Sequence, residues 1–115
     1  MKVSYEGIGQ LCASFTGSGL SVGTPVKITA NGTAAACIKG NELVGVVAAV
    51  SHGKDACSVQ LAGFVTMSYS GTAPSLGYAA LVADGSGGVK CAESSLRNRL
   101  VVDVDTTAGT VTFLL

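Results

Sequence analysis

The feature that most constrains this chain is the regular alternation of short apolar runs with glycine-containing turns. Apolar residues recur with a period of two at 57–61, 102–104 and 111–113, which is the pattern of a strand with one buried face. Turns at spacings of about 8 to 12 residues are typical of β-sandwiches and β-barrels. No segment keeps a helical period over the roughly 10 residues that a convincing helix requires. We therefore expect an all-β fold, a small β-barrel or β-sandwich with little or no helix.

Two of the turns predict particular hairpins. Asn31-Gly32 and Asp84-Gly85 supply the positive φ that tight two-residue loops demand. Residues 26–29 should therefore fold back on 33–38, and residues 80–83 on 89–92.

The chain also contains an internal similarity. Residues 21–29 align with 75–83, the two hairpin turns match after a one-residue gap, and Cys37 and Cys91 fall at corresponding places. This pattern predicts one β unit used twice, over about 20–68 and 74–115, within a single β domain that spans 20–115. The alternative is coincidence, because Ser-x-Gly and Asn/Asp-Gly are common in β-turns. Residues 1–19 are expected to form an N-terminal arm, extended or docked on a partner.

Low charge is the second unusual property of the chain. Charged residues make up 12% of it, about half the share of an ordinary soluble domain, while apolar residues make up 48%. Contact surfaces are depleted in charge at their centres, so we expect a homo-oligomer or an assembly rather than a compact monomer with a Ser/Thr surface.

The charge pattern also argues against several partners. Seven basic residues balance seven acidic ones without clustering, and the chain has no Trp, so we expect no nucleic-acid partner. The longest apolar run, 43–50, is far shorter than the roughly 20 residues of a membrane span, so no membrane partner is expected. The N-terminus shows no signal-peptide pattern, which favours synthesis and retention in a cytoplasm.

The inventory of chemically active side chains is thin. The four cysteines are far apart in sequence, and with only His52 to help them they predict reduced thiols and no metal site. Asp103 and Asp105 would share one face of a strand, where a cation site or an acid–base pair competes with a solvated edge. The stretch 85–88 is glycine-rich but lacks the Gly-Lys-Ser/Thr ending of a phosphate loop. We therefore expect no enzyme activity, no catalytic residues and no cofactor.

Two apolar features fit contact with a partner. The N-terminal arm carries Tyr5, Ile8, Leu11 and Phe15, which could anchor it on a neighbour. The stretch 63–69 is expected to continue the strand from Cys57 to Tyr69, with Phe64 on the opposite face from Val65 and Met67. Either one of these faces meets a partner, or both are buried within a small barrel.

From Gly19 to Leu115 the order of short sequence motifs resembles that of a known group of proteins. These motifs include 43–47 (Leu-Val-Gly-Val-Val), 58–65 (Ser-Val-Gln-Leu-Ala-Gly-Phe-Val) and the closing 101–105 (Val-Val-Asp-Val-Asp). The chain resembles the small capsid decoration proteins of tailed bacteriophages and prophages. The resemblance implies a virion protein, made in the bacterial cytoplasm, that binds the major capsid protein on the outside of the head, often as a trimer. It departs from some members of that family in having four cysteines and no Pro/Thr-rich N-terminal segment.

The alternative function is a non-catalytic ligand- or carbohydrate-binding β module of a phage tail or a cell surface. The Gly/Ser/Thr-rich loops of the chain favour this alternative, and Tyr69 and Tyr78 could form a platform on which a ligand stacks. An enzyme would instead require His52, Asp103 and Asp105 to meet in one cleft.

Overall fold

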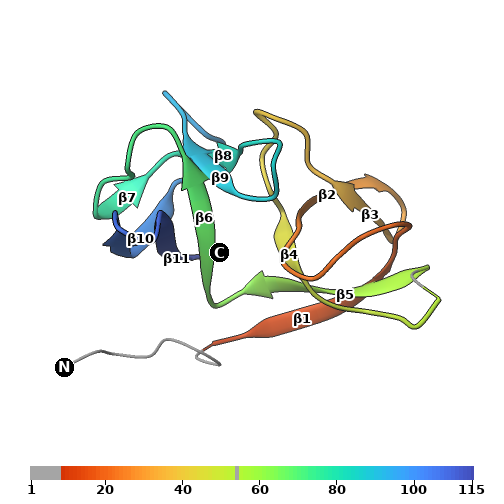
Figure 1. Cartoon of the computed structure of the whole chain (residues 1–115). Helices are drawn as coiled ribbons and strands as arrows, with labels where there is room; N and C mark the ends of the chain where they lie inside the picture. The colour runs from red at the N-terminus through yellow and green to blue at the C-terminus, as the bar shows by residue number, and fades with distance from the viewer. Residues whose placement is uncertain (1–8, 54) are drawn as a thin grey trace.

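A computed structural model of the chain describes residues 9–53 and 55–115, and these residues form strands, turns and loops without a helix. The all-β prediction is confirmed. The strands fall into two groups that lie side by side, as Figure 1 shows. The first group is β1 (Leu11–Thr16), β2 (Pro25–Ala30), β3 (Thr33–Ala36), β4 (Gly45–Val50) and β5 (Ala56–Ala62). The second is β6 (Phe64–Ser70), β7 (Gly77–Ala79), β8 (Leu81–Ala83), β9 (Val89–Cys91), β10 (Arg99–Asp105) and β11 (Thr110–Leu114).

The first half is a closed barrel with the strand order β1-β3-β2-β4-β5. The predicted hairpin is present, because β2 and β3 pair antiparallel across Asn31-Gly32 and Gly32 adopts a φ of +63°. The barrel closes where β1 and β3 run parallel, at the single pair Thr16 and Thr33. The rest of β1 is held by its antiparallel pairing with β5.

The second half is a curled six-stranded sheet with the order β7-β10-β11-β6-β9-β8. Its predicted hairpin is also present, with β8 antiparallel to β9 across the Asp84-Gly85 turn, where Gly85 has a φ of +83°. Like β1, β6 pairs antiparallel with the last strand of its half, here β11, and parallel with one other strand, here β9.

The two halves share one plan of strand pairing. In the first half, β2 pairs with both β3 and β4. In the second half two strands share this role: β8 pairs with β9, and β7 pairs with β10. A register shift between Val47 and Ala49 recurs between Val101 and Asp103 at the same point of the plan. The structure therefore consists of two similar halves, as the internal similarity predicts.

The limits of the halves differ from the sequence prediction. The repeat units run over 11–62 and 64–115, and not over about 20–68 and 74–115, because 64–70 pairs with strands of the second half. The strand from Cys57 does not continue through 63–69 as expected. Gly63, with a φ of +97°, ends β5 and turns the chain into β6.

The expected N-terminal arm is also divided. Residues 11–16 form β1 and belong to the barrel. The half-buried Ala13 and Phe15 alternate with exposed residues along this strand, and Phe15 packs against the first core. Tyr5 and Ile8 lie outside the described residues.

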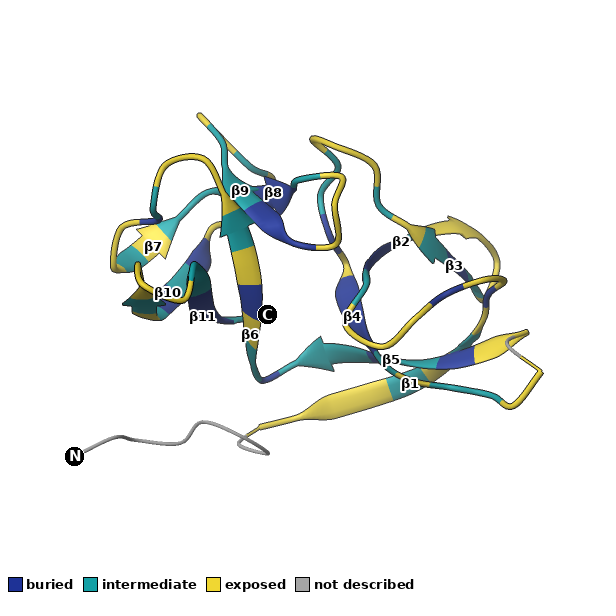
Figure 2. Cartoon of the chain, viewed as in Figure 1, coloured by how far each residue is buried: buried dark blue, intermediate teal, exposed yellow. Residues whose placement is uncertain are grey.

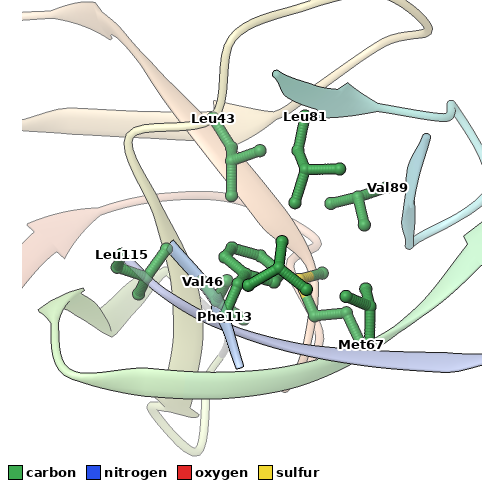
Figure 3. Close-up of a cluster of buried hydrophobic side chains, with 9 residues drawn as sticks. Leu43, Val46, Met67, Leu81, Val89, Phe113 and Leu115 are labelled. Carbon is green, nitrogen blue, oxygen red and sulfur yellow. The ribbon is translucent and has the colours of Figure 1, made fainter. Parts of the chain in front are cut away.

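Each half has its own hydrophobic core. The core of the first half contains Val26, Val47 and Val59, each at most 1% exposed. The core of the second half surrounds Phe113, as Figure 3 shows, and it includes two residues of the first half, Leu43 and Val46. These two side chains fasten the barrel to the curled sheet, because their burial depends on both halves.

A buried arginine adds a polar link between the halves. Arg99 of β10 is 5% exposed, and its Nη2 donates to the carbonyl oxygen of Leu43 at 2.6 Å. Its Nε has no hydrogen-bond partner among the described residues. Burial, followed by the positive charge of Arg97, lowers the pKa of Arg99, while Glu42 acts in the opposite direction. The connection is completed by backbone bonds of Gly40 and Asn41 to Ala83.

Candidate interaction surface

The residues predicted to meet a partner lie at different depths. Leu11, at the start of β1, is 59% exposed. Phe15, Phe64 and Tyr69 are half-buried, and Tyr69 packs against the second core. Met67 is 6% exposed and lies within that core, so it is not available to a partner. The described candidates therefore do not share one exposed face.

Other apolar side chains are more exposed than these candidates. Sequence reasoning about partner contacts selected only Leu11 from the large hydrophobic residues that the structure exposes. The others are Val22, Ile28, Ile38, Val44, Leu76, Tyr78 and Leu96, with exposed fractions from 42% to 93%. The sequence held one signal for such exposed residues, the Ser-x-Gly turn pattern that occurs in both halves. Val22 and Leu76 occupy its middle position and are 65% and 68% exposed.

Three exposed apolar residues lie on two adjacent loops, 37–44 and 92–98, which we call the junction loops. Ile38, Val44 and Leu96 are 64%, 42% and 93% exposed. A hydrogen bond from the Leu96 N–H to Glu42 Oε1, at 2.6 Å, joins the two loops. The exposed side chains of Lys39 and Arg97 belong to the same loops. Glu42 and Glu93 lie on these loops as well, so the junction loops combine apolar contact area with charges of both signs.

The residues that an enzyme would need belong to different halves of the fold. His52 lies in the turn between β4 and β5, whereas Asp103 and Asp105 lie on β10. Asp105 has a local role, since its Oδ1 accepts the N–H groups of Thr107 and Ala108 at 3.0 Å each. Such bonds stabilise a β-turn.

The cysteines are unpaired. Cys12 is exposed, Cys57 is buried, and Cys37 and Cys91 are partly buried. Burial raises the pKa of the Cys37 thiol, and the charge of Lys27 opposes that effect. Within residues 9–53 and 55–115, no three His, Cys, Asp or Glu side chains are arranged to hold a metal ion.

The glycine-rich stretch 85–88 is a hairpin tip in which the N–H groups of Ser86 and Gly88 are already bonded. Asp84 Oδ1 accepts from the N–H groups of Ser86 and Gly88 at 2.7 and 3.0 Å, and its Oδ2 accepts from Ser70 Oγ at 2.6 Å. Partial burial acts to raise the pKa of Asp84, but these hydrogen bonds together outweigh it and hold the pKa below the ordinary value. The carboxylate of Asp84 therefore already binds two of the N–H groups that a phosphate loop would use.

The lowered pKa of Asp84 predicts a pH-dependent contribution to stability. A depressed carboxyl pKa stabilises the fold above the unfolded value of about 4, and this contribution disappears as the pH falls through the folded value. We expect Asp84→Asn to lower Tm by several degrees at pH 7, and the difference from wild type to shrink below about pH 4. Thermal unfolding followed by circular dichroism across this range measures it.

The matched control is Ser86→Ala, which keeps both Asp84 and the backbone donor of residue 86 and should follow the wild-type pH profile. A Tm difference for Asp84→Asn that is the same at pH 7 and pH 3 would contradict the assignment.

The described part of the chain contains no helix with the length and hydropathy that a bilayer span requires. Comparison with known proteins adds no relative: no protein-family model matches the chain, and no curated protein matches its sequence.

Proposed function

We propose that this chain is a virion structural protein, a decoration subunit that binds the outer surface of a phage-type head and stabilises it. Its partners are further copies of itself, as a homotrimer, and the major capsid protein, and its place is the virion. The observation that carries the proposal is the set of large apolar side chains exposed on the described surface of a fold with so little charge. Scattered exposed apolar residues are normal, but a group of them on two joined loops fits a contact surface.

The junction loops are the part of the surface that fits the shell best. Leu96 is the most exposed large apolar residue among those described, at 93%, and the loop that carries it is tied to the core by Arg99 and to its neighbour by Glu42. A loop held in this way presents an apolar side chain at little entropic cost on binding. The charges of Lys39 and Arg97 on these loops are balanced by those of Glu42 and Glu93. They favour no partner of one charge sign, and the apolar side chains supply the contact area.

Particles purified from cells that carry the gene provide the direct test. Quantitative mass spectrometry should find the chain in stoichiometric proportion to the major capsid protein, and its absence from purified particles would contradict the proposal. We expect Leu96→Ser to lower the occupancy of particles by about tenfold, as for loss of a central contact residue. Its Tm should not change, because surface substitutions away from packing usually alter stability by less than about 0.5 kcal/mol.

Val22→Ser is the matched control, since Val22 is also exposed, at 65%, but lies away from the junction loops in sequence. It should retain full occupancy. Equal losses for Val22→Ser and Leu96→Ser would show that the junction loops are not the docking surface.

The oligomeric part of the proposal is tested by light scattering at several concentrations. The expected mass is that of three chains, or of paired trimers, independent of dilution. A monomer at every concentration would contradict self-assembly in solution.

A further inference from the structure

One edge of strand β1 is unpaired over most of its length in the part of the chain that the structure describes. The strand pairs with β5 along its whole length, but with β3 only at Thr16 and Thr33. Between Leu11 and Phe15 no strand of the described residues lies on the side away from β5. Figure 2 shows exposed residues over much of this strand.

The direction of the backbone groups on this edge follows from one hydrogen bond. The N–H of Thr16 donates to the carbonyl oxygen of Gly32 at 2.8 Å, so the backbone groups of Thr16 point away from β5. In a strand these groups alternate from edge to edge with a period of two. The N–H and C=O groups of Ser14 and Cys12 therefore point to the free edge, while those of Ala13 and Phe15 point to β5. The register with β5 is regular from Cys12 to Thr16.

Within residues 9–53 and 55–115, this edge lacks the features by which proteins prevent strand addition. Such features are charged side chains, proline, bulges and covering loops. Neither β1 nor its neighbours β5 and β4 contain a charged residue or a proline, and the one irregularity against β5 lies at the end of β1, between Leu11 and Cys12. In the second half, the first residue of the equivalent strand β6 receives a hydrogen bond from Gln60 Nε2 to the Phe64 carbonyl oxygen at 3.3 Å. The outward N–H and C=O groups of Cys12 and Ser14, which no described strand pairs, are thus available on β1.

We propose that this edge binds the same edge of a second copy of the chain, with the two β1 strands antiparallel about a two-fold axis. A neutral strand meets its own copy without like-charge repulsion, whereas a charged partner would find no complementary side chain on β1, β5 or β4. An isologous pair also satisfies both edges at once. With Ala13 on the axis, Cys12 of each copy lies opposite Ser14 of the other, and their outward groups form four hydrogen bonds. The result is one continuous sheet, β4-β5-β1-β1-β5-β4.

This contact goes beyond the proposed function and does not rest on it. The contact needs only two copies of the chain; in the proposed trimer it would join neighbouring trimers to one another, and the junction loops remain separate from it. The edge contact can therefore fail while binding to the head is retained, and the reverse also holds.

The exposed Cys12 makes the pair measurable in the unmodified full-length chain. In the proposed register the two Cys12 side chains are diagonal neighbours on one face, about 7–8 Å apart, within reach of a short bismaleimide. Cross-linking followed by denaturing electrophoresis should give a covalent dimer with wild type and none with Cys12→Ser. No covalent dimer from wild type at any protein concentration would overturn the proposal.

Substitution of Ser14 tests the backbone contact itself. Ser14→Pro removes an outward N–H from each copy but leaves the pairing with β5, which uses the alternate residues. Two of the four hydrogen bonds are lost per pair, so the protein concentration needed for half-maximal cross-linking should rise at least about tenfold. Ser14→Lys, which places like charges across the axis, should have the same effect and keeps the test valid if the proline variant does not fold.

The control is Thr29→Lys, an equally exposed position on β2, which should cross-link like wild type. Circular dichroism establishes that each variant is folded. Unchanged cross-linking in folded Ser14→Pro or Ser14→Lys would overturn the pairing of β1 with β1.

Discussion

Replacement of Phe113 by alanine should destabilise the protein by about 3–5 kcal/mol, the range measured for loss of a buried aromatic side chain. Phe113 is 0% exposed and belongs to the cluster that contains Leu43 of the first half and Leu81 of the second. Its removal therefore weakens both the curled sheet and its attachment to the barrel. Because a domain has only about 5–15 kcal/mol of net stability, the loss is a large part of the total.

Guanidinium chloride unfolding at constant temperature measures this effect from the shift in midpoint and slope. The comparison variant is Phe15→Ala, since Phe15 is half-buried and packs only at the margin of the first core. It should lose clearly less stability than Phe113→Ala. Equal losses would mean that the second core does not depend on Phe113 as its centre.

The parts of the fold that were predictable from sequence are those fixed by neighbours in the chain. Asn31-Gly32 and Asp84-Gly85 determine their hairpins because the required positive φ is a property of the turn itself. The two similar halves were predictable because the same local phrases occur twice. Alternation of apolar and polar residues identified segments as strands, but it did not identify which strands pair with one another.

The errors came from pairings between distant residues. The N-terminal segment appeared free because β1 is held by β5, at least 40 residues later in the chain, through contacts that no local pattern encodes. Met67 appeared available for contact because alternation shows only that it shares a face with Val65, and that face is the core side of β6. Leu96 was missed because its loop has no period, so nothing in sequence indicates which way its side chain points.

Gly45 is the residue at which the first barrel should be most sensitive to added volume. It begins β4, pairs with Val26 of β2 and lies against β5. A Cβ at this position would overlap the carbonyl oxygen of Gln60 and lie 2.7 Å from Val59 Cγ1, closer than real Cβ atoms approach their neighbours. Since the first obstacle is backbone, relief requires a shift of β4 against β5.

We expect Gly45→Ala to destabilise the protein by about 1–3 kcal/mol, the range for overpacking in a close-packed interior, measured by the same denaturant unfolding. Gly53→Ala is the control, because its Cβ would meet only Asp55 Oδ1 at 3.7 Å, which is an ordinary contact. It should leave stability within about 0.5 kcal/mol of wild type. If Gly45→Ala were equally harmless, the close approach of β4 to β5 would not be a requirement of the barrel.

The second half shows what happens at the same position without glycine. Val46 faces Gln60 just before the register shift, and Leu100 faces Leu114 just before the matching shift, so Gly45 corresponds to Arg99. There a large side chain reaches out to the carbonyl oxygen of Leu43, and the strand equivalent to β2 is interrupted into β7 and β8. Glycine in one half permits the tight contact of a closed barrel, and arginine in the other uses the same position to bind the barrel to the open sheet.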